Sequence, residues 1–179
     1  MRTPTVLVAI ATAAGMLSLG VGLPTSADAV GGTTMTVTVV GGALAITVPT
    51  DAGNLGTRVN TVGAGIISGP LGPVQVTDAR SAVAGSGWVA SVISTAFTPL
   101  TGPTIAASLV GYTAGTITKV GTATYTANDP SNLTGVVPAV TATGITGDNS
   151  ASWNPTINVT IPGGTVVGVY SATITHSVV

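Results

Sequence analysis

Apolar and polar residues alternate along much of the chain after residue 30. Residues 34–39 alternate strictly, with threonine at each polar position. Successive side chains of a β-strand point to opposite faces, so this pattern predicts a strand with one apolar and one hydroxyl-bearing face. Gly41 and Gly42 interrupt the pattern, and a second apolar segment, residues 44–48, ends at Pro49. Residues 34–39 and 44–48 are therefore predicted to form a β-hairpin.

Further segments of this kind follow, and turn residues separate nearly all of them. The predicted strands are residues 74–77, 88–95, 116–120, 123–126, 136–143, 156–161 and 169–178. Residues 51–73 are rich in glycine and contain Pro70 and Pro73, which predicts a long connection. Glycine, threonine and valine dominate, and all are poor helix formers. We expect an all-β fold, a two-sheet antiparallel β-sandwich (Ig-like) of about eight strands, with little helix apart from a signal peptide.

The N-terminus carries the ordered features of a secretory signal peptide. Arg2 is followed by an apolar run, residues 6–19, then by Pro24 and by Ala27-Asp28-Ala29, which has small residues at the cleavage-determining positions. The run is shorter than the roughly 20 residues that cross a bilayer as a helix, so an uncleaved anchor is the weaker alternative. We predict a signal peptide of residues 1–29 and one secreted domain of residues 30–179, with no membrane span after cleavage.

Charged residues are scarce, and this excludes several classes of function. After residue 29 the chain has no glutamate and no cysteine, and its charged side chains are Arg58, Arg80, Lys119, Asp51, Asp78, Asp129 and Asp148. Nucleic-acid binding requires clustered cations, so we expect none. The missing cysteines exclude disulfides and thiolate metal sites. A surface so poor in charge repels its copies weakly, which makes self-association a serious hypothesis.

Two blocks of sequence resemble the WxL family of bacterial surface domains. The first is V-T-D-A-R at residues 76–80 followed by G-S-G-W-V-A-S at 85–91, similar to the family's V-x-D-x-R-G…G-W-x-L block. The second is I-P-G-G at residues 161–164 leading to G-V-Y-S-A-T-I-T-H-S-V at 168–178, similar to its closing block Y-x-x-x-L-T-W-x-L. Two departures stand out, because Ala90 replaces the first motif's leucine and His176 replaces the second tryptophan.

The resemblance implies a secreted β-sandwich that attaches non-covalently to peptidoglycan through the two blocks. It points to Asp78, Arg80 and Trp88 in the first block and to Tyr170 and His176 in the second as contacts with the cell wall. We add Trp153, before Asn154-Pro155, as a candidate exposed aromatic on which a sugar ring could stack.

Several of these residues also have a purely structural interpretation. Trp88 heads an apolar strand and is expected either to anchor the core or to present its edge at the binding surface. Asp78 and Arg80 are two residues apart and could form an ion pair, which fixes the loop before Trp88 if it is partly buried and contributes little if it is exposed. Trp153 could instead cap one end of the sandwich.

Catalysis and metal binding are not expected. His176, the only histidine, falls on the inward face of its predicted strand, and no Gly-x-Ser-x-Gly turn supplies a nucleophile. A transition-metal site would lack ligands. Residues 128–132 and 147–150 hold oxygen donors that calcium uses, but without the spacing of a known calcium loop. We therefore expect a non-enzymatic protein without cofactors.

Two functional hypotheses remain open. The leading one is a secreted cell-surface domain that binds the bacterial cell wall, or other surface proteins, around Trp88 and the last strand. The alternative is a structural subunit that assembles through its strand edges into a coat or filament, because lysine, which usually protects such edges, occurs once.

Overall fold

Antiparallel strands make up most of the protein. The computed structural model describes residues 34–179, so the predicted signal peptide lies outside the described residues. The ten strands are β1 Leu44–Thr47, β2 Gly65–Pro70, β3 Val74–Ser94, β4 Thr98–Pro99, β5 Val110–Thr113, β6 Thr118–Ala127, β7 Val137–Trp153, β8 Thr156–Ile161, β9 Tyr170–Ser171 and β10 Ile174–Val178. The one helical element of this part is a short 3₁₀ turn, η1 Ala107–Leu109, so the predicted all-β class is confirmed. No helix within residues 34–179 is long and apolar enough to span a membrane.

The largest sheet is built around two long strands. Its order is β1-β3-β7-β6, and β10 also pairs with β3. The strand β3 has β7 along one edge, while β1 lies along Gln75–Asp78 and β10 along Ala90–Ser94. The predicted second block of the family resemblance is thus hydrogen-bonded to the first.

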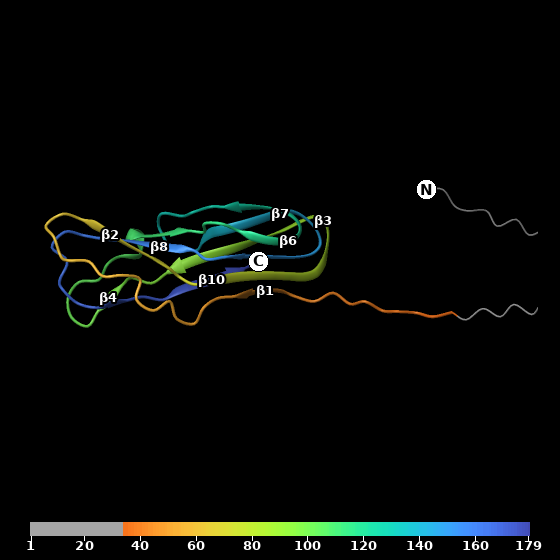
Figure 1. Ribbon diagram of the computed structural model, residues 1–179, viewed down its shortest axis with the longest axis horizontal. Coiled ribbons are helices and arrows are strands. Elements are labelled where there is room, and N and C mark those ends of the chain that lie inside the picture. The colour runs from red at the N-terminus through yellow and green to blue at the C-terminus, as the bar shows by residue number, and fades with distance from the viewer. Residues whose placement is uncertain (1–33) are drawn as a thin grey trace, which may run out of the picture. The chain divides into compact units, whose positions relative to one another are not determined.

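Both long strands bend where their ladder is irregular. The β3–β7 register shifts between Asp78 and Trp88, and Ser81 lies in the left-handed region with φ of 54°. Trp88 is in register with Ala142 on β7, yet its indole donates a hydrogen bond to Asn149 of the same strand. An extended strand would separate residues 142 and 149 by roughly 23 Å, far beyond the reach of an indole. The strands therefore fold back on themselves, and Figure 1 shows β3 curving round one end of the sandwich.

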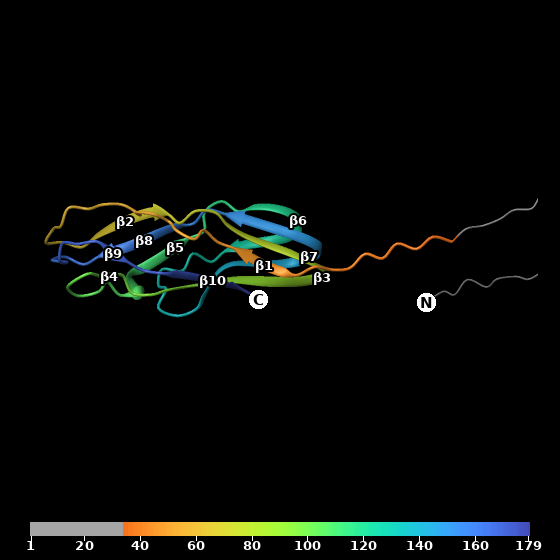
Figure 2. The ribbon, with the colours of Figure 1, turned by 90° about the horizontal axis from the view of Figure 1, so that it is seen from below.

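The other end of the sandwich is formed by two smaller sheets. One has the order β2-β8-β5, which Figure 2 shows side by side, and the other pairs β4 with β9. Valine, isoleucine and alanine of β3, β5, β7 and β8 fill the space between the sheets, together with Trp88, Tyr112 and Trp153. Packed antiparallel sheets around one apolar core confirm the predicted sandwich.

The strand boundaries differ from the sequence prediction in several places. Residues 34–40 form no strand and are exposed, so the predicted hairpin is wrong, and β1 pairs with β3 instead. The segments 74–77 and 88–95 belong to the single strand β3, and β6 likewise joins two predicted strands. The predicted connection 51–73 contains β2, while β4 and β5 were missed. The segment 156–161 coincides with β8, as predicted.

Candidate functional site

A buried polar cluster, here called the Trp88 cluster, occupies the bent end of the sandwich. It consists of Arg80, Asp78, Asn149, Trp88 and Tyr125. The indole Nε1 of Trp88 donates to Asn149 Oδ1 at 3.0 Å, and Asn149 Nδ2 donates to Asp78 Oδ2 at 3.3 Å. Asp78 and Asn149 are register partners on β3 and β7, so both point inward. The cluster therefore ties the two folded layers together.

Arg80 and Tyr125 complete the hydrogen bonding of this cluster. Arg80 donates through Nε to Asp78 Oδ1 at 2.8 Å and through Nη2 to Oδ2 at 2.9 Å. The Tyr125 hydroxyl donates to Asn149 Oδ1 at 3.3 Å, and its ring lies 5.7 Å from that of Trp88. Every buried polar atom of Asp78 and Asn149 thus has a partner, which is what burial of such groups requires.

The paired guanidinium decides the ionisation of this buried carboxylate. Hydrogen bonds from the Arg80 side chain, supported by its backbone N–H and by Asn149, outweigh burial and lower the pKa of Asp78 below its ordinary value. Burial, followed by the negative charge of Asp78, raises the pKa of Tyr125. The carboxylate is therefore charged and the phenol neutral across the physiological range.

This geometry favours the structural interpretation of the first block. The Trp88 side chain is buried, with 2% of its surface exposed, so its ring cannot stack on a ligand in this conformation. Asp78 is fully buried, and Arg80 is the one member of the pair that reaches solvent. The partly buried alternative for the Asp78–Arg80 pair is the one observed.

A second cluster, the Tyr112 cluster, joins Trp153 and His176. Trp153 Nε1 donates to the Tyr112 hydroxyl at 2.7 Å, and His176 Nε2 lies 3.3 Å from the same oxygen. The His176 and Tyr112 rings meet edge to face at 5.6 Å. Trp153 is 3% exposed, so the expectation of an exposed sugar-stacking aromatic is wrong. It packs inside the sandwich because β7 continues to residue 153 and turns this side chain toward β5.

His176 is neutral in this environment. It is opposite Val92 on the inward side of β10, as predicted, and Nδ1 is buried without a hydrogen-bond partner. Burial lowers the pKa of His176 to about 4 and also raises that of Tyr112. Protonation would place an N–H on Nδ1, which has no acceptor, whereas the neutral ring can leave Nδ1 unprotonated while Nε2–H donates to the Tyr112 hydroxyl. A histidine held this way helps to pack the core.

Tyr170 lies apart from both clusters, in a groove. The groove has a volume of about 790 Å³ and is bordered by residues 49–61, the end of β8 and residues 165–174. Leu55, Ile67 and Ile161 form part of an apolar floor, while Tyr170 and neighbouring hydroxyl and amide groups supply polar atoms. The Tyr170 hydroxyl donates to the Val166 carbonyl at 2.8 Å, which positions the ring. Of the predicted contacts, Tyr170 alone lines this groove.

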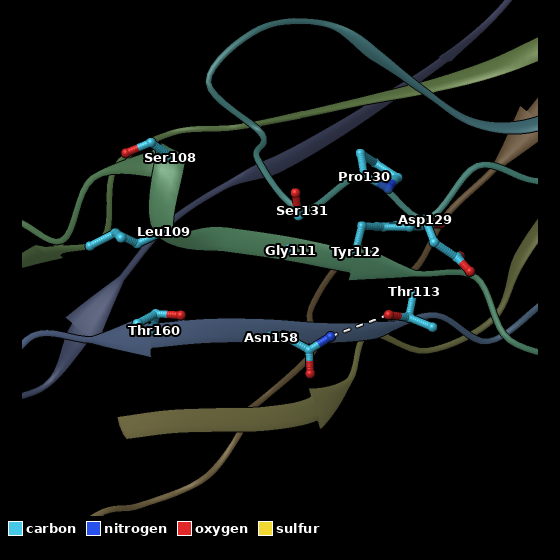
Figure 3. Close-up of a pocket in the computed structure, with 10 residues that line it drawn as sticks. All are labelled: Ser108, Leu109, Gly111, Tyr112, Thr113, Asp129, Pro130, Ser131, Asn158 and Thr160. Carbon is cyan, nitrogen blue, oxygen red and sulfur yellow. Dashed lines mark hydrogen bonds between the residues drawn. The ribbon is translucent and has the colours of Figure 1, made fainter. Parts of the chain in front are cut away.

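A smaller cavity of about 260 Å³ lies over β5 and β8. Figure 3 shows the segment with Asp129, Pro130 and Ser131 passing beside β5, and Asn158 of β8 donating to Thr113. Asp129 Oδ1 already accepts a hydrogen bond from the Ala114 backbone N–H at 2.7 Å. The carboxylate is thus used to hold the loop against the strand.

The structure also describes the loops considered for calcium. Residues 128–132 contain the Asp129 contact, and Asp148 accepts from Ser81. Within residues 34–179 no three histidine, cysteine or acidic residues lie close enough to hold a metal ion.

Sequence reasoning missed Asn149, Tyr112 and Tyr125, which connect the predicted residues to one another. Asn149 falls within residues 147–150, considered above only as oxygen donors for calcium, and β7 runs through this segment. Tyr112 belongs to β5, a strand of four residues without clear alternation. The period-two pattern places a side chain on a face, but it does not tell which distant strand faces it.

Comparison with known proteins finds no matching protein family, no matching curated protein and no matching solved structure, so the resemblance to WxL domains stays a prediction.

Proposed function

We propose that this protein is a non-enzymatic structural subunit whose copies associate through their strand edges into a coat or filament at the surface of a bacterial cell. The observation that carries the proposal is the outer edge of β6. This strand is ten residues long, ends the order β1-β3-β7-β6, and has no buried residue. The strand β6 has one charged residue, Lys119, and contains no proline.

Such an edge is normally protected, because its free N–H and C=O groups can pair with another chain. Other edges of the described sheets show protection. Beside β5, the Tyr112 N–H donates to the Pro130 carbonyl at 2.8 Å, so a loop covers that strand. The strand β2 ends in Pro70, and β1 is four residues long. The β6 ladder is irregular on either side of Thr122, but residues 124–127 pair regularly with β7, so this uncharged stretch of the edge is the natural place for a copy to add.

Size and shape across concentration test this proposal. We expect size-exclusion chromatography and negative-stain microscopy to show polymers of the wild-type protein. The double change Thr124→Lys and Thr126→Lys places charges on the exposed face of β6 and is expected to shift the population toward monomers. The matched control, Thr101→Lys and Thr104→Lys, adds the same charge in an exposed loop and should still polymerise. A wild-type protein that stays monomeric at every concentration overturns the proposal.

Association with the cell wall is a second candidate, and the groove beside Tyr170 favours it. A hollow of about 790 Å³ lined by apolar side chains and by hydroxyl and amide groups suits a mostly uncharged ligand such as part of a glycan strand. For this candidate function, we therefore place the cell-wall binding site in the groove beside Tyr170 and not around Trp88.

Sedimentation with purified cell walls tests the second candidate. We expect the wild-type protein and the variant Trp88→Phe to sediment equally, because the Trp88 ring is interior. Tyr170→Ala should reduce the bound fraction. Polymers can sediment by themselves, so the bound fraction is the excess over protein that sediments without walls. If wild-type protein shows no such excess, this candidate is wrong whatever the polymer experiment gives.

A further inference from the structure

We propose that residues 34–40, here called the donor segment, add as an extra strand beside β6 of a second copy. The inference rests on the proposed function and names both surfaces that meet. It assigns a role to a segment that forms no strand in the described structure and to an edge that no strand of residues 34–179 covers.

The donor segment has the pattern of a strand but pairs with no strand among residues 34–179. Met35, Val37 and Val39 are exposed by 87%, 89% and 87%, and threonine occupies each position between them. Within residues 34–179, no backbone hydrogen bond outside regular ladders involves residues 34–40, and no strand includes them. An apolar row left in water costs free energy that burial against a sheet would recover, at about 25 cal/mol per Å².

The edge of β6, here called the acceptor edge, has apolar side chains that an added strand could cover. Ala123 and Tyr125 on the inward side of β6 pack against the core but are only half-buried. An added strand would cover them with the apolar row of the donor segment, and its threonines would then lie beside Thr124 and Thr126 on the outward side. The donor segment is uncharged, and β6 has one lysine, so no like-charge repulsion opposes the contact.

The chain that follows the donor segment argues for pairing between copies. Gly42 donates to the Ala79 carbonyl, and Ala79 donates to the Ala43 carbonyl, which holds this stretch beside β3. The chain that leads out of the donor segment is thus held beside β3 at the β1 edge, and β1 and β6 lie at opposite edges of the sheet, with β3 and β7 between them. A second copy offers a β6 edge without this restriction.

Disulfide trapping tests the contact directly, because the chain has no cysteine of its own. Variants with one cysteine in the donor segment, Thr34→Cys, Thr36→Cys or Thr38→Cys, are each mixed with a variant carrying Thr124→Cys and oxidised. We expect at least one mixture to give a linked dimer in several-fold higher yield than either variant alone. The matched control, Val37→Cys mixed with Thr124→Cys, puts the two thiols on opposite faces and should give no such excess.

A charged substitution in the donor segment tests the role of this segment separately from the assembly of copies as such. Val37→Asp is expected to reduce polymerisation at least tenfold, whereas Thr36→Asp, one residue away and on the outward face, should have a much smaller effect. If Val37→Asp polymerises like the wild-type protein and no trapped dimer forms, the inference is wrong while edge-mediated assembly stands. If wild-type protein forms no polymer, the proposed function itself fails.

Discussion

At the scale of single residues, the polar side chains that stand out in the sequence are used inside the fold. Asn149 of β7 accepts hydrogen bonds from Trp88 and Tyr125 and donates to Asp78. Its single amide group therefore links β7 to β3 and to β6. Removing one member of a buried network leaves its partner unsatisfied, which costs more than the bond itself contributes. Substitutions in the Trp88 cluster should therefore change the free energy of unfolding, and any effect on function should follow from that change.

Trp88→Phe is predicted to lower the free energy of unfolding by about 1–3 kcal/mol, because the buried Asn149 Oδ1 keeps only the longer hydrogen bond from Tyr125 and the smaller ring leaves a cavity in the core. Urea denaturation followed by circular dichroism measures the change. Tyr125→Phe is the comparison, since this half-buried hydroxyl is replaceable by water, and its effect should be smaller. Equal stability of Trp88→Phe and the wild type would contradict the role assigned to the Trp88 cluster.

His176 predicts a dependence of stability on pH. Its pKa is about 4 in the folded protein and near 6.5 when unfolded, so between these values the unfolded chain binds more protons. The free energy of unfolding should therefore fall as the pH is lowered from about 6.5 to about 4, by an amount on the order of 2–3 kcal/mol.

Denaturation at several pH values measures this effect, and His176→Phe is the control that should remove it. The carboxylate of Asp78 does not interfere, because its lowered pKa places its own loss of stability below its ordinary value of 3.8. An equal slope in the wild type and in His176→Phe would show that another group is responsible.

At the scale of elements, the bend shared by β3 and β7 organises the fold. Ser81 and Gly85 adopt positive φ within the irregular part of the ladder, and Gly87 lies where the two backbones approach closely. A Cβ atom built on Gly87 would lie 2.6 Å from the Ala142 carbonyl oxygen. The small residues before Trp88 thus allow the chain to turn and the indole to enter the core.

Gly87→Ala is predicted to destabilise the protein by about 1–3 kcal/mol, because the methyl group meets backbone that cannot move without opening the ladder. Thermal unfolding measures the loss. Gly135→Ala is the control, since nothing lies within 4 Å of its added Cβ, and we expect a change within about 0.5 kcal/mol. A control as damaging as Gly87→Ala would remove the steric explanation.

At the scale of the whole molecule, the surface is apolar and hydroxyl-rich, with little charge. Exposed apolar side chains include Val62, Val83, Leu100 and Val167. Between copies, repulsion is weak and screened within about 10 Å at ordinary ionic strength, so contacts depend on burial and backbone hydrogen bonds. The expected assemblies are therefore coats or filaments held together by buried apolar surface and backbone hydrogen bonds. Attraction between opposite charges is not expected to bring the copies together.

Polymerisation is accordingly predicted to change little with sodium chloride concentration and to strengthen with sulfate, which favours burial of apolar surface. Light scattering at constant protein concentration follows both salts. Dissolution of the polymers by moderate sodium chloride would contradict an interface that is nearly free of charge.

The period-two pattern by itself determined the class of fold, because alternation with threonine and valine is incompatible with amphipathic helices and suits packed sheets. It also placed His176 on the inward face of its strand. Only the tertiary structure decided that residues 74–77 and 88–95 are one bent strand, that Trp153 is interior, and that Asn149 and Tyr112 link the predicted residues. The physical reason is that local periodicity specifies which face a side chain occupies, whereas partners across a bend or between sheets depend on contacts between residues far apart in the chain.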